Sequence, residues 1–439
     1  MSDSSTPPAV DQPSELAPVR RSPLRRAKTA ALSVTYGAAV TLLAACTSSA
    51  TADASASSSP SATAGPSTSE TTTGSSITAG PGAGGGAAPS GAMPSCGRGP
   101  GGGGGGMQTF TAVDLDTAGA NASDANTADV VAAANAFLAS LPAEQKDTAT
   151  FDFTDNQSRQ TWSNFPAAQV PRKGIELSAL SAASKTAAMA LVKTMLSAEG
   201  YSQVQTIQAA DDWLKVNSAS GTTSFGSDTD YYLAVYGTPS STDPFMVQFG
   251  GHHLARNYTY KGATASITPD FTGTEPKDFT VNGTDVQPMK EKAGTLFSLY
   301  SSLTAAQNAK AKLSATINDI LMGPGVDSGK FPTTAGVKVS DMSAAQQKLV
   351  IAAIQAWVND ANPGIAASLM QTYTAQLDQT YVSYANSDTV DGENTYLRID
   401  GPRVWIELVN TRSQSTPNVH YHGVYRDKTD DYGSTNPSA

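Results

Sequence analysis

Residues 396–409 read Tyr-Leu-Arg-Ile-Asp-Gly-Pro-Arg-Val-Trp-Ile-Glu-Leu-Val, and they carry a clear signal for the class of fold. Its two ends, Tyr396–Ile399 and Val404–Val409, are rich in β-branched and aromatic residues, which favour strands. Asp400 and Gly401 between them are typical of a turn. The stretch therefore predicts two antiparallel strands joined as a hairpin near the end of the chain.

Further strands and several helices are expected before this hairpin. Tyr231–Tyr236 and Phe245–Phe249 have the composition of strands. After Ser181 and after Ser343, apolar residues recur at helical spacing, which predicts two amphipathic helices with one buried face each. Three more helices are expected near Ala128–Ser140, Met289–Ser301 and Ala366–Gln379. This mixture predicts an α+β fold, a single domain with a largely antiparallel sheet flanked by amphipathic helices.

A short pattern recurs in four places: an apolar residue, then a capping residue or proline, then alanine-rich sequence that favours a helix. The four copies begin at Leu141, Leu180, Leu303 and Met342. Ser181, Thr304 and Ser343 are the predicted N-caps, each preceded by an apolar residue that can pack on the first turn. Because the spacing is irregular, we interpret the pattern as a shared way to begin a helix, not as a structural repeat.

Composition divides the chain into three parts. Residues 1–45 are predicted to be a lipoprotein signal peptide. Residues 46–106 consist almost entirely of Ser, Thr, Ala, Pro and Gly, which cannot bury enough surface to fold, so a disordered tether is expected. Residues 107–434 contain all four tryptophans and are predicted to form one globular α+β domain. The formal net charge of −10 argues against nucleic acid as a partner.

Both cysteines, Cys46 and Cys96, precede the globular part, so the sequence excludes a disulfide or a thiolate metal site within it. A basic segment, residues 20–28, precedes an apolar run, residues 29–45, in the order typical of a signal peptide. The run ends in Leu-Ala-Ala-Cys46, which resembles the lipobox of bacterial lipoproteins. We therefore expect export and a membrane anchor, through acylated Cys46, on the outer face of the cytoplasmic membrane. A transmembrane anchor and an ordinary cleaved signal are the alternatives, Sec and twin-arginine export both stay open, and so does the role of Cys96.

The four histidines of the chain form two pairs in the sequence. His252 and His253 follow two glycines, and His420 and His422 are separated by one residue. Side chains at positions i and i+2 of a strand share a face, so His420 and His422 can point at one ion. Since neutral imidazole binds Zn, Cu or Fe, we predict a transition-metal site from these four residues. The alternative is that the histidines are merely packed or hydrogen-bonded.

Charged residues near the histidines suggest further roles. Glu407 and Asp427, close in the sequence to His420 and His422, are candidates for a general base or for a hydrogen-bond partner behind the ligands. A possible anion-binding set comprises Arg172, Lys173, Arg403 and Arg426, since guanidinium groups bind carboxylate or phosphate through paired hydrogen bonds. Ion pairs with the many acidic residues are the alternative for this set.

Motifs spread over the globular part also carry a family resemblance. They are Arg172-Lys173-Gly174, Gly251-His252-His253-Leu254 with Asn257, Thr268-Pro269, Gly401-Pro402-Arg403, His420-Tyr421-His422, Arg426-Asp427 and Asp431-Tyr432-Gly433. Together they resemble a bacterial family catalogued as domain of unknown function 3500, over roughly residues 129–433. The resemblance implies a single domain, and it implies no activity and no catalytic residue.

Two functions are compatible with these features. The first is an exported lipoprotein with a histidine-rich transition-metal site, acting as a metal-dependent hydrolase or oxidase of a small-molecule substrate. The second is a metal-free extracytoplasmic lipoprotein that binds an organic anion. A structural domain of the cell envelope with packed histidines is a third. The sequence decides neither enzymatic activity, nor the metal, nor the substrate, nor the oligomeric state.

Overall fold

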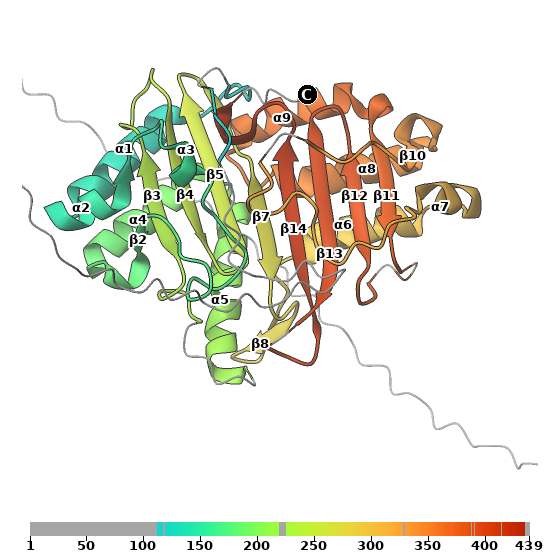
Figure 1. Ribbon diagram of the computed structural model, residues 1–439, viewed down its shortest axis with the longest axis horizontal. Helices are drawn as coiled ribbons and strands as arrows, with labels where there is room; N and C mark the ends of the chain where they lie inside the picture. Colours follow the sequence, from blue (N-terminus) through green and yellow to red (C-terminus); the bar gives the residue numbers. More distant parts are fainter. Residues whose placement is uncertain are drawn as a thin grey trace, which may run out of the picture. The chain divides into compact units, whose positions relative to one another are not determined.

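The computed structural model describes residues 112–116, 119–218, 225–327, 330–387, 389, 391–413 and 415–434. The predicted signal peptide and tether, with Cys46 and Cys96, lie outside the described residues. The rest folds as α+β around one mostly antiparallel sheet, as predicted (Figure 1).

In the described part of the chain, 12 strands form this sheet, and only β1 and β3 pair in parallel. The strands are β1 Thr150–Phe151, β2 Ile175–Glu176, β3 Tyr232–Tyr236, β4 Phe245–Gly251, β5 Leu254–Lys261, β6 Thr264–Ser266, β7 Asp270–Thr274, β10 Val337–Lys338, β11 Tyr381–Ala385, β12 Tyr396–Asp400, β13 Val404–Arg412 and β14 Val419–Asp427. A separate small hairpin is formed by β8 Phe279–Val281 and β9 Thr284–Val286. All four predicted strands are confirmed within three residues at each end, including the hairpin of β12 and β13. The largest difference is at β13, which continues to Arg412.

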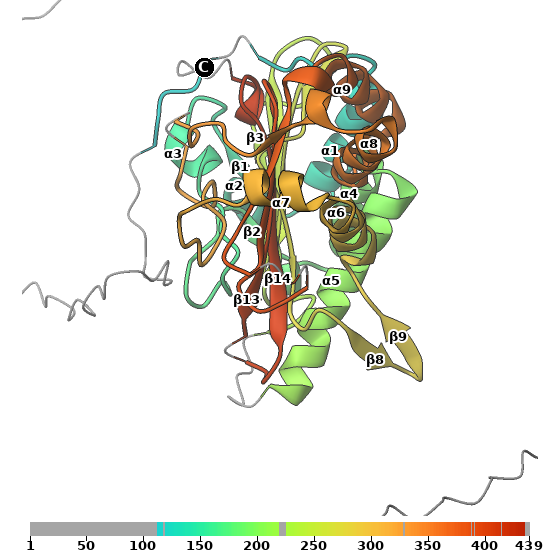
Figure 2. The same cartoon turned by 90° about the vertical axis from the view of Figure 1, so that its right-hand side faces the viewer.

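Most helices cover one face of the sheet (Figure 2). They are α1 Thr127–Ala139, α4 Ala182–Met195, α5 Ala198–Asn217, α6 Lys290–Ser301, α8 Ala344–Val358 and α9 Pro363–Ala375. The other face is covered by α3 Asn156–Arg159 and by irregular segments, from which Phe153, Trp162, Met322 and Phe331 pack onto strand residues such as Trp405. The remaining helices are α2 Ala143–Ala149, α7 Ala305–Ala311, η1 Leu177–Ala179, η2 Val339–Asp341, η3 Leu377–Gln379 and η4 Asp431–Gly433. Among the described residues, no helix combines the length and the apolar character needed to cross a bilayer.

The predicted N-caps are confirmed. The side chain of Ser181 accepts a hydrogen bond from the amide of Ser184 at the start of α4. Thr304 and Ser343 form capping boxes with Gln307 and Gln346 at the starts of α7 and α8. Each cap satisfies amides that the first turn of a helix leaves without an intrahelical partner.

The structure contains an internal repeat, so our interpretation of the recurring helix starts was wrong. The series α1, α2, β2, η1, α4 is followed by α6, α7, β10, η2, α8, and Ala143 at the start of α2 precedes its equivalent Ala305 in α7 by 162 residues. The sheet is arranged in the same way: from the central pair β7 and β14 it continues to β5, β4, β3 on one side and to β13, β12, β11 on the other. The helix starts appeared irregular because consecutive copies were compared. Leu141 and Leu180 lie 39 residues apart, and so do Leu303 and Met342.

Two glycines show how closely the halves correspond. Gly174 and Gly336 have φ angles of +96° and +116°, a region that glycine adopts readily. A Cβ atom would lie 2.4 Å from the carbonyl oxygen of Leu233 in β3 at the first position, and 2.2 Å from that of Val382 in β11 at the second. The same close approach of backbone to strand is therefore used once in each half.

Candidate metal centre

His252 and His253 form the tip of a hairpin. They are the two residues between Gly251 in β4 and Leu254 in β5, which pair with each other. His253 has a φ of +60°, which costs a residue with a side chain about 1–2 kcal/mol. Two backbone hydrogen bonds hold it: its amide donates to the carbonyl of Asn164 (3.2 Å), and its carbonyl accepts from the amide of Gly273 (2.8 Å). Such an unfavourable conformation at a buried imidazole is typical of a functional position.

His420 and His422 lie on β14 and share one face of the sheet, as predicted. In the neighbouring strand β7, Gly273 is directly opposite His422. A Cβ atom at Gly273 would lie 2.9 Å from Cδ2 of His253. The glycine therefore leaves the space through which the hairpin tip reaches the strand pair.

The four imidazoles come together, although they belong to stretches of chain about 170 residues apart. The Nε2 atom of His422 lies 3.1 Å from Nε2 of His253 and 3.0 Å from Nε2 of His420. The ring of His252 lies beside that of His253, with centroids 3.8 Å apart. None of the four histidine residues is more than 6% exposed. Two nitrogens bound to one ion at about 2.0–2.1 Å lie about 2.9–3.4 Å apart, so both of these Nε2–Nε2 distances fit nitrogens that share one ion. One possible ligand atom from each of His253, His420 and His422 lies within 4.8 Å of the others.

The protonation of the rings suits metal binding. Nδ1 of His422 lies 2.9 Å from Oδ1 of Asp319, so its proton belongs on Nδ1 and Nε2 carries a lone pair. Burial, together with the neighbouring imidazoles, lowers the pKa of His253 and of His420 well below the ordinary value. Both rings are therefore neutral near pH 7, the form that binds metal ions.

A second group adjoins the first and uses His252. Its Nδ1 lies 2.6 Å from Oδ1 of Asp211, which projects from α5, and Oδ2 of Asp211 accepts a hydrogen bond from the Tyr231 hydroxyl (2.6 Å). Nε2 of His252 lies 3.8 Å from Oε2 of Glu275, just beyond β7. Burial lowers the pKa of His252 to about 4 and raises that of Asp211 well above its usual range. Asp211, His252 and His253 each offer one possible ligand atom, and these atoms lie within 4.8 Å of one another.

The two carboxylates expected near the histidines have other positions. Glu407 is fully buried and accepts hydrogen bonds from the amides of Leu321 (2.6 Å) and Met322 (2.9 Å). It thereby holds the irregular segment that carries Asp319, so it acts behind the ligands. Asp427 lies five residues beyond His422 on β14, and therefore on the other face of the sheet, where it pairs with Arg403. The carboxylates that do reach the imidazoles, Asp211, Asp319 and Glu275, were not predicted.

The predicted anion-binding residues do not form one site. Arg172 donates to backbone carbonyls, including those of Ser163 (2.8 Å) and of Gly251 at the histidine hairpin (3.2 Å), and Lys173 lies half-buried next to it. The other two arginines form ion pairs: Arg403 with Asp427 (2.6 Å), and Arg426 with Asp327 (2.5 Å) and Asp431 (2.7 Å). The guanidinium groups thus serve as structural partners, which was the alternative for this set.

A family model described as a protein of unknown function, DUF3500, matches residues 123–434. The chain belongs to the DUF3500 family. The match covers both halves of the repeat and all four histidines, so the histidine cluster lies inside the family's domain. Comparison with curated proteins and with solved structures gives no match.

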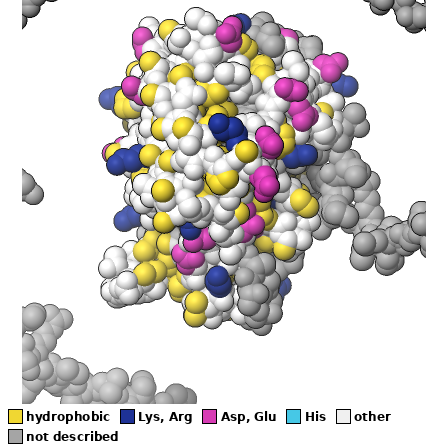
Figure 3. Space-filling model, turned by 90° about the vertical axis from the view of Figure 1, so that its left-hand side faces the viewer, with side chains coloured by type: hydrophobic (Ala, Val, Ile, Leu, Met, Phe, Trp, Pro, Cys, Tyr) yellow, Lys and Arg dark blue, Asp and Glu magenta, His cyan; other side chains and the backbone are white. Residues whose placement is uncertain are grey.

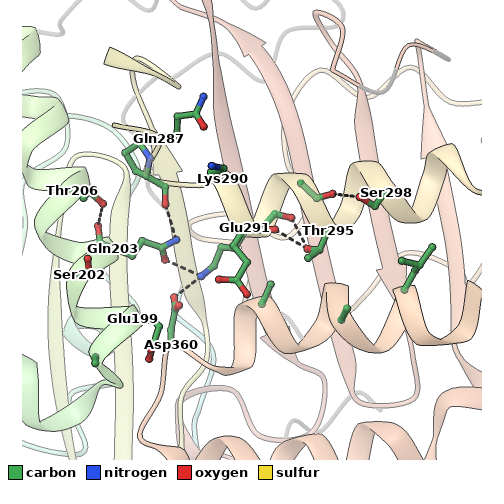
Figure 4. A pocket seen from close by; sticks show the side chains of 17 residues that line it. Glu199, Ser202, Gln203, Thr206, Gln287, Lys290, Glu291, Thr295, Ser298 and Asp360 are labelled. Carbon is green, nitrogen blue, oxygen red and sulfur yellow. Dashed lines mark hydrogen bonds and ion pairs between the residues drawn. The ribbon is translucent and has the colours of Figure 1, made fainter. Parts of the chain in front are cut away.

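A groove of this DUF3500 domain lies elsewhere, between α5, α6 and α8 on the helical face (Figure 4). It has a volume of about 940 Å³. At its base, Nζ of Lys292 lies 2.7 Å from Asp360 and 2.8 Å from Gln203. None of the histidines lines it, and none appears on the surface seen in Figure 3, where charged side chains are scattered among apolar ones. The groove is therefore separate from the candidate metal centre.

Proposed function

We propose that this DUF3500 protein is an exported lipoprotein that binds a transition metal ion, Zn, Cu or Fe, through Nε2 of His253, His420 and His422. The convergence of these three nitrogens, two pairs of them 3.0 and 3.1 Å apart in a buried cluster, carries the proposal. Two of the ligands come from a strand and the third from a hairpin tip held in an unfavourable conformation, so the protein fixes their positions before an ion arrives.

Hydrogen bonds alone satisfy this cluster poorly. Nε2 of His422 offers one lone pair to two neighbouring Nε2 atoms, so only one N–H can point at it well. Among the described residues, the Nδ1 atoms of His253 and His420 have no hydrogen-bond partner. Buried polar atoms in native proteins are normally paired. A cation at the common point accepts a lone pair from each ring and removes the conflict.

The carboxylate partner of His422 supports the same proposal. Ligating histidines usually donate their second ring N–H to a carboxylate or carbonyl, which orients the ring and increases its basicity. Asp319 does this for His422, and Glu407 fixes the segment from which Asp319 projects. A metal-free anion site is less well supported, because the arginines proposed for it are already paired with protein groups.

For the chemistry, we propose metal-dependent hydrolysis or oxidation of a small-molecule substrate. A bound ion of this kind polarises a substrate oxygen or lowers the pKa of a bound water. His252 would hold its Nδ1 proton toward Asp211 and present Nε2 beside the ion, where it can accept a proton. The triad of Tyr231, Asp211 and His252 keeps that ring in one orientation.

Elemental analysis of the purified full chain, together with two single variants, tests metal binding. We expect bound transition metal in the wild type and its loss in His420→Ala. Asn418→Ala is the matched control, because Asn418 is exposed two residues before His420 and belongs to no ligand set. A wild type without metal after mild purification, or His420→Ala with the full content, contradicts the proposal. Far-UV circular dichroism establishes that both variants fold.

Export and anchoring are tested separately. We expect Cys46→Ser to move the protein from the membrane fraction to the soluble fraction, since the thiol is the proposed site of acylation. The metal content should not change, because Cys46 precedes the domain. A variant that stays membrane-bound would argue for a transmembrane anchor instead.

A further inference from the structure

We propose a second cation position next to the first, formed by Asp211, His252 and Nδ1 of His253, so that the His253 ring bridges two ions. This inference rests on the proposed function, because the first ion uses the other nitrogen of the same ring. The ligand class is a second divalent transition metal ion.

The unpartnered nitrogen of His253 is the first reason. Nε2 of His253 faces His422, which leaves Nδ1 as the free ligand atom of the ring. Within the part of the chain that the structure describes, that atom is buried without a hydrogen-bond partner, in a residue only 2% exposed. The ring of His422 satisfies its own second nitrogen with Asp319. His253 lacks such a partner, although the hairpin holds its backbone rigidly.

The second reason is the position of Asp211 and His252. A ligand atom from each lies within 4.8 Å of one from His253, and all three residues are buried. The 2.6 Å contact between Asp211 and His252 brings a carboxylate oxygen and an imidazole nitrogen to the same side of the hairpin. One oxygen and two nitrogens form a donor set that Zn²⁺ and Cu²⁺ accept.

The charge around His252 points the same way. Asp211, Asp230 and Glu275 are at most 5% exposed and surround this imidazole. The guanidinium of Arg172 also acts on His252, but it donates to backbone carbonyls. A divalent cation supplies the missing charge.

The balance of the binding step is simple. Imidazole carries one proton on its two nitrogens, so a ring that binds two ions has lost that proton to solvent. Two coordinate bonds form at His253, one at each nitrogen, and no oxidant or reductant takes part. The second ion also replaces the hydrogen bond between Asp211 and Nδ1 of His252 by a bond to each. His252 stays neutral because its proton moves from Nδ1 to Nε2, on the side of Glu275, so the proton-accepting role of His252 applies to the chain with one ion.

Copper titration of the full, metal-free chain tests the proposal, with Cu²⁺ as the probe. We expect two Cu²⁺ per chain in the wild type and an electron paramagnetic resonance signal that integrates to clearly less than two spins, because two ions joined by one ring couple magnetically. Asp211→Asn and His252→Gln should each bind one ion, with a signal of about one uncoupled spin. His253→Ala should weaken both positions.

Tyr373→Phe is the matched control, since Tyr373 follows Asp211 by 162 residues and occupies the equivalent helix position in the other half. It should keep two coupled ions. One Cu²⁺ in the wild type, lost in His420→Ala, overturns the second position and leaves the first intact. Two coupled ions in both Asp211→Asn and His252→Gln also overturn it. A chain that binds no ion overturns both positions together.

Discussion

The two halves of the domain contain the same hairpin, but different side chains occupy its tip and surround it. In the first half, Gly251 and Leu254 enclose His252 and His253; in the second, Gly401 and Val404 enclose Pro402 and Arg403. The helix behind the first hairpin contributes Asp211, and the helix behind the second contributes Tyr373, at the equivalent position.

The two hairpins differ in how many of the polar groups around them have hydrogen-bond partners. Arg403 makes two hydrogen bonds to Asp427, at 2.6 and 3.1 Å, and the Tyr373 hydroxyl donates to the same carboxylate at 2.9 Å. Around the histidines, ring nitrogens face one another, and among the described residues two of them, Nδ1 of His253 and Nδ1 of His420, have no hydrogen-bond partner. The same hairpin therefore places a fully hydrogen-bonded ion pair in the second half, and imidazole nitrogens without hydrogen-bond partners in the first.

Removal of metal should produce the largest change in stability, and it should act on the histidine cluster alone. An ion present at about 1,000 times its dissociation constant stabilises the fold by about 4 kcal/mol. For a domain of this size we expect chelation to lower the thermal midpoint of the wild type by roughly 8 °C. Scanning calorimetry with and without chelator measures the shift. In His422→Ala the chelator should have no effect, and an equal shift in that variant would mean that the histidines are not the ligands.

Asp427→Ala should remove the ion pair with Arg403 in the second half without changing the metal centre. It removes the buried partner of Arg403 and of Tyr373, so we expect a loss of about 3 kcal/mol in the free energy of unfolding. Urea unfolding measures that loss, and elemental analysis should give the wild-type metal content. A fall in metal content in a folded variant would show that the two hairpins are coupled, contrary to the comparison.

A smaller loss of stability is expected at two glycines that occupy equivalent positions in the two halves, and it tests whether the halves are also equivalent in energy. Gly174→Ala and Gly336→Ala each place a Cβ atom against a strand carbonyl at a positive φ. We expect each to cost about 2 kcal/mol, from the backbone conformation and the close contact together. Urea unfolding of both variants gives the two losses. Values that differ by several kcal/mol would show that the repeat is not energetically symmetric.

Local signals in the sequence predicted much of the fold. The β-branched run around Trp405 and the caps at Ser181 and Ser343 depend on nearest neighbours, and the structure confirms them. The turn lies at Pro402 and Arg403, two residues after the predicted Asp400 and Gly401, because Asp400 still pairs with Trp405. The repeat was missed because its period is longer than any local pattern. A comparison of the chain with itself at an offset of 162 residues would have aligned Leu141 with Leu303 and Leu180 with Met342.

The histidines of the candidate site were also identified from the sequence, because four such residues in two pairs are conspicuous in a chain of this length. Their carboxylate partners were not. Asp211 lies in the middle of a long helix, Asp319 in an irregular segment, and Glu275 beyond the end of a short strand. Nothing local distinguishes them from the other acidic residues, since only tertiary packing brings them to an imidazole.

The central pairing of β7 with β14 has a consequence for how the molecule could be divided. If the two halves were separated, each of these strands would be the edge of its own half-sheet. Its unpaired amide and carbonyl groups could then pair with a strand of another molecule. A polypeptide cut near residue 288 would present such an edge on both fragments, and each would be prone to aggregate. The ligands are divided along the same line, with His253 on one fragment and His420 and His422 on the other. An ion bound by all three histidines would link the two fragments, so binding of the ion and pairing of β7 with β14 would occur together.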